Sequence, residues 1–97
     1  MKQPKARILV VEDDRALLQG LLDVLVFNGY EVKGVEDGGV GLRVGVAEQF
    51  DLILLDVMLP TIDGFSICRE IRKEKPAQGI IIITAKGAED DIVTGFK

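Results

Sequence analysis

The chain has no histidine and only one cysteine, Cys68. The lack of histidine excludes catalysis that depends on a histidine base, and a single cysteine cannot form a disulfide within the chain. We interpret Cys68 as a small buried hydrophobic residue in a reducing cytoplasm. No apolar run has the length of a signal-peptide core or of a membrane span. These absences predict a cytoplasmic protein with no membrane partner.

Positive charge is also scarce. Lysine and arginine number 12 against 16 acidic residues, which gives a net charge of -4, and the basic residues are scattered. Nucleic-acid binding depends on clustered basic residues, so we expect no direct nucleic-acid partner. The glycine fingerprint of dinucleotide-binding folds and the phosphate-binding P-loop are both absent, which argues against a nucleotide site. The length of 97 residues predicts a single small domain.

Short apolar runs rich in valine and isoleucine alternate with helix-length segments. Such runs are typical of buried strands in a parallel sheet, and the alternation favours an α/β fold with helices on both faces. At this length, a doubly wound sheet in the flavodoxin-like order 2-1-3-4 suits the chain better than the longer dinucleotide fold. The expected strands are 8–11, 30–35, 52–55 and 80–84, and the expected helices are 15–27, 39–48, 64–75 and one that begins near Ala88.

Aspartates and glycines mark the expected helix ends. Asp14 is a suitable N-cap for the helix 15–27, and Gly29 suits the left-handed position that closes it. Asp63 is expected to provide turn and N-cap chemistry for the helix 64–75. The segment 39–48 is the exception, because three glycines within it each cost roughly 1 kcal/mol relative to alanine. We expect that helix to be short or mobile.

Polar residues end three of the expected strands. In a parallel sheet all carboxyl ends share one edge, where ligands bind, so these residues should converge. If the first and third strands are neighbours, their carboxylates repel one another, and either one stays protonated or a divalent cation neutralises the group. An open cluster of hard oxygen ligands suits Mg²⁺ or Mn²⁺. The residues concerned are Glu12, Asp13, Asp56 and Thr84.

Carboxylates of this kind can do more than hold a metal. A carboxylate beside Mg²⁺ can act as a nucleophile on phosphorus and form an aspartyl phosphate. The metal offsets charge on the transferring phosphoryl group, and a nearby hydroxyl such as that of Thr84 can donate a hydrogen bond to a phosphate oxygen. The predicted edge therefore has the chemistry of a phosphate-accepting site.

Three motifs, in order and in register, resemble the receiver domain of two-component response regulators. The motifs are Val10-Val-Glu-Asp-Asp14, Leu55-Asp-Val-Met-Leu-Pro60 followed by Asp63-Gly64, and Ile83-Thr-Ala85. The resemblance implies that Asp56 is the phosphoacceptor and that Asp13 ligates the metal directly. It further implies that Glu12 acts largely through water, that Met58 offers its backbone carbonyl to the metal, and that the Thr84 hydroxyl moves toward the phosphate.

The resemblance also implies a partner and a mode of action. The phosphoryl donor would be the phosphohistidine of a sensor histidine kinase or a phosphotransfer protein, and the domain would be a switch more than a turnover enzyme. The family continues through a fifth strand with a phosphate-pairing lysine and a fifth helix. We therefore expect residues 1–97 to form a receiver domain that is incomplete at its C-terminus. The exposed fourth strand then predicts self-association.

Two other functions stay open. The first is a receiver-like dimerisation or docking module that phosphorylation does not switch. The second is a phosphatase-type enzyme with Asp56 as nucleophile. That enzyme needs a second acid two residues further on to protonate the leaving group, and position 58 is methionine. The phosphatase is therefore disfavoured.

Overall fold

The computed structural model describes residues 5–83, in which strands and helices alternate as the sequence predicts. No helix in this part of the chain is long and apolar enough to cross a bilayer. The helix predicted near Ala88 and the predicted last residue of the fourth strand, Thr84, lie outside the described residues. The elements are β1 (Arg7–Val11), α1 (Arg15–Phe27), β2 (Glu31–Val35), α2 (Gly38–Ala47), β3 (Leu52–Asp56), α3 (Gly64–Glu74) and β4 (Ile80–Ile83).

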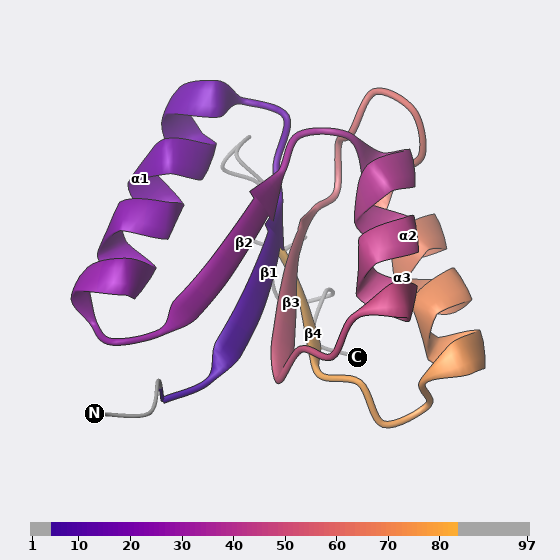
Figure 1. The fold of residues 1–97 in the computed structure, drawn as a ribbon. Coiled ribbons are helices and arrows are strands. Elements are labelled where there is room, and N and C mark those ends of the chain that lie inside the picture. The colour runs from indigo at the N-terminus through magenta and orange to yellow at the C-terminus, as the bar shows by residue number, and fades with distance from the viewer. Residues whose placement is uncertain (1–4, 84–97) are drawn as a thin grey trace.

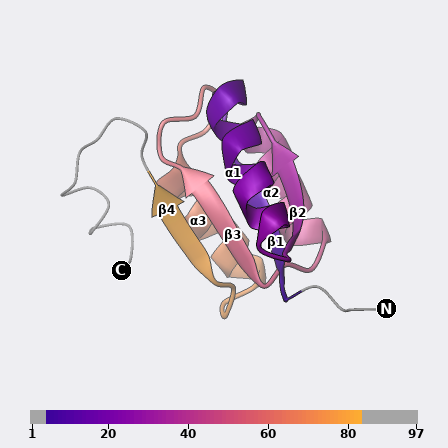
Figure 2. The same ribbon diagram turned by 90° about the vertical axis from the view of Figure 1, so that its left-hand side faces the viewer.

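The described strands form one parallel sheet in the order β2-β1-β3-β4 (Figures 1 and 2). This confirms the predicted flavodoxin-like order. Strand β1 is central, and its last residue, Val11, lies opposite Val35 of β2 and Leu55 of β3. Strand β4 pairs with β3, and Ile83 lies opposite Asp56. Because all pairs are parallel, the strands present their carboxyl ends at one edge.

Helices cover both faces of the sheet: α1 lies on one face, and α2 and α3 lie on the other (Figure 1). Successive strand residues point to opposite faces, so β1 contributes to two cores. Ile8 and Val10 pack with Leu18 of α1, whereas Leu9 and Val11 belong to the larger core on the α2 and α3 side. Burial on both faces explains why β1 is continuously apolar from Ile8 to Val11.

Helix α3 buries one apolar stripe. Ile67 and Ile71 are fully buried in the larger core, and Cys68 is half-buried beside them. Phe65 lies outside this stripe and is 40% exposed. Phe65 precedes Ile67 by two residues, which places it about 200° away around the helix.

An aspartate caps the N-terminus of each described helix. The caps at Asp14 and Asp63 confirm the sequence prediction. Asp37 caps α2 in the same way. Gly29, after α1, has a φ of 93°, the left-handed conformation predicted for it. The carboxylates of Asp14, Asp37 and Asp63 accept hydrogen bonds from the backbone N–H groups of Leu17, Val40 and Ser66.

The glycines of α2 serve close packing. A Cβ atom at Gly41 would lie 2.8 Å from Cγ2 of Val11, and one at Gly45 would lie 2.8 Å from Cδ1 of Ile71. The missing side chains let α2 approach β1 and α3 more closely than a substituted helix could. The helix runs for 10 residues and is not shortened. The sequence prediction counted the propensity cost of these glycines but not what they gain in packing.

Replacing Gly41 with alanine is expected to lower the free energy of unfolding by about 1 kcal/mol, although alanine is the better helix former. Val11 is fully buried and β-branched, so it cannot move away from the new methyl group. Gly20 of α1 is the matched control, because nothing lies within 4 Å of a Cβ atom built there. Gly20→Ala is expected to raise the free energy of unfolding by about 1 kcal/mol. Urea denaturation measures both, and equal effects would contradict the packing role of Gly41.

Candidate metal-binding site

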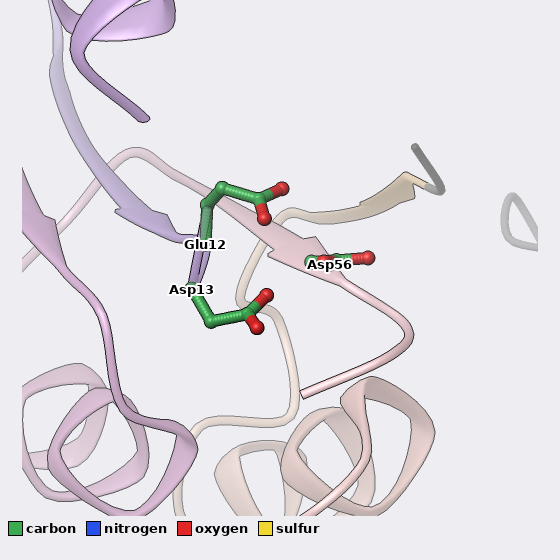
Figure 3. A group of neighbouring side chains, drawn as sticks. All are labelled: Glu12, Asp13 and Asp56. Atoms are coloured by element: carbon green, nitrogen blue, oxygen red, sulfur yellow. The ribbon is translucent and has the colours of Figure 1, made fainter. Parts of the chain in front are cut away.

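Three acidic side chains meet at the carboxyl edge of the sheet. Glu12 and Asp13 directly follow β1, and Asp56 is the last residue of β3, the neighbouring strand. One carboxylate oxygen from each lies within 4.8 Å of the others. Figure 3 shows the three carboxyl groups on the same side of the two strand ends. The structure thus brings together three of the four residues that the sequence places at this edge.

The Glu12 carboxylate is buried at the carboxyl edge of the sheet. Its side chain is 1% exposed, and Oε2 accepts a hydrogen bond from the backbone N–H of Asp14 at 3.0 Å. Oε1 is buried and has no hydrogen-bond partner among residues 5–83. Burial raises the pKa of Glu12 to about 7, and the negative charge of Asp56 acts in the same direction. A buried acceptor with acidic neighbours and no donor is an environment that favours a cation.

The position of Asp56 is set by its own backbone neighbours. Its side chain is 4% exposed, and Oδ1 accepts a hydrogen bond from the backbone N–H of Met58 at 3.2 Å. Gly64, the first residue of α3, lies so close that a Cβ atom there would be 2.6 Å from the Asp56 carbonyl oxygen. The Gly64 N–H also donates to the Val57 carbonyl at 3.1 Å. The start of α3 therefore packs directly on the backbone that carries the Asp56 carboxylate.

The donor set fits a hard divalent cation. Glu12, Asp13 and Asp56 offer only carboxylate oxygens, which Mg²⁺ and Mn²⁺ prefer. Asp13 is exposed while the other two are buried, so the cluster opens to solvent and leaves room for water ligands. Met58 follows Asp56 by two residues, and its side chain is 56% exposed. Its backbone carbonyl as a metal ligand stays a prediction.

Thr84, the predicted phosphate-contacting hydroxyl, lies outside the described residues, although Ile83 before it in the sequence pairs with Asp56. Sequence reasoning also missed a contact: the Thr61 hydroxyl donates to Oδ1 of Asp37 at 2.7 Å. The available signal was the N-cap pattern, an aspartate three residues before the apolar Val40. Nothing in the sequence indicated its pairing with Thr61.

A doubly wound parallel sheet with acids gathered at its carboxyl edge defines a small α/β domain with a candidate cation site at the strand ends. The family model for the response regulator receiver domain matches residues 8–97. The chain therefore belongs to the response regulator receiver domain family, as its three motifs predicted.

Relatives agree with this assignment. The response regulator MprA of Mycolicibacterium vanbaalenii is 39% identical over 90 residues, which cover 93% of this chain and 39% of MprA. The chain thus spans about two fifths of the length of the curated relatives it matches.

Solved structures are similar too. The response regulator TrrA of Thermotoga maritima, in complex with Mg(2+)-BeF, is 35% identical, with a TM-score of 0.81 over 88% of this chain and 74% of that one. The receiver domain of the sensor histidine kinase PA1611 of Pseudomonas aeruginosa has a magnesium ion coordinated in its active-site cleft. It is 32% identical, with a TM-score of 0.80 over 93% of this chain and 78% of that one.

Proposed function

We propose that residues 1–97 form a cytoplasmic phosphoacceptor switch domain in which Asp56 takes up a phosphoryl group. The donor would be the phosphohistidine of a sensor histidine kinase or of a phosphotransfer protein. The observation that carries the proposal is the meeting of Glu12, Asp13 and Asp56 within 4.8 Å at the carboxyl edge of the sheet. Membership of the receiver family supports the same role.

The metal in this proposal is Mg²⁺ or Mn²⁺, held by the three carboxylates and the backbone carbonyl of Met58. The buried Oε1 of Glu12, which has no hydrogen-bond partner within residues 5–83, supports a cation at this place. The magnesium ion in the receiver domain of PA1611 supports it by analogy. A bound divalent ion would offset the negative charge of the phosphoryl oxygens as they approach the acids. Without such an ion, the acids would repel an anionic donor.

The chemistry of transfer is a substitution at phosphorus. A carboxylate oxygen of Asp56 attacks phosphorus, a P–O bond forms, and the P–N bond to the donor histidine breaks. The histidine nitrogen leaves with the electron pair of that bond. When the switch is reset, water attacks phosphorus, and the bond between phosphorus and the Asp56 carboxylate oxygen breaks. This step returns the Asp56 carboxylate and inorganic phosphate, so the domain is reset without acting as a turnover enzyme.

In this transfer the protein mainly orients the Asp56 carboxylate and the phosphoryl group. The Met58 N–H holds Oδ1 of Asp56, which leaves the other carboxylate oxygen as the nucleophile. The close approach of Gly64 keeps the Asp56 backbone in place during the attack. Thr84 would donate its hydroxyl hydrogen bond to a phosphate oxygen. Its position directly after Ile83, the partner of Asp56 in the sheet, supports that role.

Incubation with Mg²⁺ and acetyl phosphate tests the proposal. The expected result is covalent addition of one phosphoryl group per chain, seen by intact mass spectrometry and placed on Asp56 by peptide mapping. A chain that gains no phosphate under these conditions overturns the switch. Sustained hydrolysis of phosphate esters by a catalytic amount of protein would instead identify a phosphatase.

A second candidate, a dimerisation or docking module, has one observation in its favour. Within residues 5–83, β4 is an outer strand that pairs only with β3, and Ile81 and Ile83 in it are half-buried. Outer apolar strands are templates for pairing with another chain. We therefore expect concentration-dependent self-association in sedimentation experiments. A single monomeric species at high protein concentration would contradict this candidate, whatever the outcome with acetyl phosphate.

A further inference from the structure

The loop 57–63 between β3 and α3 contains Met58, whose backbone N–H donates a hydrogen bond to Oδ1 of Asp56. The loop has no regular secondary structure. Leu59 is 9% exposed in the larger core, and Ile62 packs against the same core. The Met58 side chain is 56% exposed, so its own packing does little to fix its backbone. The position of the Met58 N–H and carbonyl therefore depends on what holds the rest of the loop.

One carboxylate outside the acid site reaches this loop. Asp37, the N-cap of α2, accepts a hydrogen bond from the backbone N–H of Val40 on Oδ2 at 3.0 Å. Its other oxygen, Oδ1, accepts the hydrogen bond from the Thr61 hydroxyl at 2.7 Å. Within residues 5–83, this is the loop's one side-chain hydrogen bond to an element other than β3 or α3. Asp37 thus joins the first turn of α2 to the loop 57–63.

The charge state of Asp37 favours the bridge that its hydrogen bond with Thr61 forms between α2 and the loop 57–63. The hydrogen bond from the Thr61 hydroxyl, followed by the one from the Val40 N–H, holds the pKa of Asp37 below its ordinary value. The carboxylate is then ionised at neutral pH, and a hydrogen bond to an ionised acceptor is stronger than one between neutral groups. The bridge is therefore present under the conditions in which the acid site would bind a cation.

Backbone packing brings the same two segments together. A Cβ atom at Gly38, the residue after Asp37, would lie 2.7 Å from Cγ2 of Ile62 and 2.8 Å from its carbonyl oxygen. The loop thus rests directly on the first turn of α2 beside the Asp37 to Thr61 hydrogen bond. Helix α2 fixes the loop on one side, and Gly64 at the start of α3 fixes it at the Asp56 backbone.

We propose that Asp37 and Thr61 are positioning residues for the acid site: their hydrogen bond ties the loop 57–63 to α2 and holds the Met58 backbone beside Asp56. This inference rests on the proposed function, because it gives the Met58 carbonyl and the Asp56 carboxylate their roles. Neither Asp37 nor Thr61 belongs to the acid cluster. They act by limiting the drift of a backbone ligand, and small displacements of a ligand weaken a metal site strongly.

The variants separate this bridge from the helix cap. Thr61→Val removes the hydroxyl, keeps the shape of the side chain and leaves the cap of α2 intact. Asp37→Ser keeps an N-cap of comparable strength but is too short to cap α2 and reach Thr61 at once. Thr61→Ser keeps the hydroxyl and is the conservative control. Urea denaturation of each variant shows that it is folded under the assay conditions.

Two measurements report on the site itself. Calorimetric titration with Mg²⁺ gives the dissociation constant, and intact mass spectrometry gives the rate of phosphate uptake from acetyl phosphate. Thr61→Val is expected to weaken Mg²⁺ binding and to slow phosphate uptake by about fivefold each, the effect of one net hydrogen bond. Asp37→Ser should behave in the same way, and the double variant should be no worse than either single variant. Thr61→Ser should restore both values.

The outcomes also distinguish this inference from the proposed function. A Thr61→Val protein with reduced stability but wild-type Mg²⁺ affinity and uptake rate would show that the bridge is only structural, which overturns the inference. A double variant whose defect is the product of the single defects would overturn it too, because the two residues would then act separately. If the wild-type protein takes up no phosphate but Thr61→Val still weakens Mg²⁺ binding, the switch fails and the positioning role stands.

Discussion

Replacing Asp56 with asparagine is expected to abolish phosphate uptake from acetyl phosphate in the presence of Mg²⁺. The amide oxygen of asparagine is not a nucleophile of useful strength, and the neutral side chain also removes one ligand charge from the site. The substitution preserves shape, and the amide oxygen can still accept the hydrogen bond from the Met58 N–H. The variant should therefore fold, so the loss reports on chemistry. Intact mass spectrometry measures the remaining adduct.

Asp23 offers the matched control for Asp56. It is an exposed aspartate of α1 that accepts a hydrogen bond from Gln19, far from the strand ends. Asp23→Asn should take up phosphate at the wild-type rate. An adduct that persists in Asp56→Asn would show that another acid, with Asp13 the first to test, is the true acceptor. The stability of metal-free Asp56→Asn should not fall, because the change removes a negative charge next to Glu12.

The metal-free domain is expected to lose stability as the pH rises from about 5 to 8. Burial raises the pKa of Glu12 from 4.5 to about 7, so the folded state binds this proton more tightly than the unfolded chain does. Protonation therefore favours folding in this window, and the benefit disappears as the pH passes through about 7. A shift of this size corresponds to roughly 3 kcal/mol of the free energy of unfolding.

Few other side chains are expected to titrate between about pH 5 and 8 and so to change the stability there. The chain has no histidine, the side chain that ordinarily titrates there. The pKa values of Asp37, Glu48 and Asp63 are lowered, chiefly by hydrogen bonds from Thr61, Lys33 and the Ser66 backbone respectively. Groups with lowered pKa values stabilise the fold above their ordinary pKa, and that stability is lost only at more acidic pH. Their effect therefore has the opposite sign and lies below the window of Glu12.

Urea denaturation at several pH values, with a chelator present, measures this dependence. Glu12→Gln should be nearly insensitive to pH over the window, whereas Glu36→Gln, which changes an exposed partner of Arg15, should keep the wild-type slope. Added Mg²⁺ should stabilise the wild-type protein more at pH 8 than at pH 5, because the proton and the cation compete for the same carboxylate. A Glu12→Gln protein with the wild-type slope would disprove the assignment to Glu12.

Much of the fold could be predicted because its signals are local. The strands are short apolar runs, and their order follows from the alternation with helices and the length of the chain. Asp14 and Asp63 could be identified as caps because each directly precedes an apolar helical pattern. Errors arose where a residue's role depends on a distant partner. Gly41 is costly by helix propensity, yet it allows contact with Val11, thirty positions earlier in the sequence.

The candidate site, like the fold, could be predicted from the sequence only in part. Motifs around Asp13, Asp56 and Thr84 identified the family and the acids, and the sheet order brought the first two together with Glu12. The unpaired oxygen of Glu12 and the bridge from Asp37 to Thr61 could not be predicted. Both depend on which atoms burial leaves without a donor, and on which loop comes to rest on which helix.

The amino-acid sequence by itself determined the element types, the parallel sheet and the identity of the acids at its edge, because hydrophobic periodicity and capping act over a few residues. Tertiary structure alone decided how closely α2 approaches β1, how deeply Glu12 is buried and what holds the loop that contains Met58. Those properties arise from packing between segments remote in sequence, because protein interiors are close-packed and each surface limits how closely the other can approach.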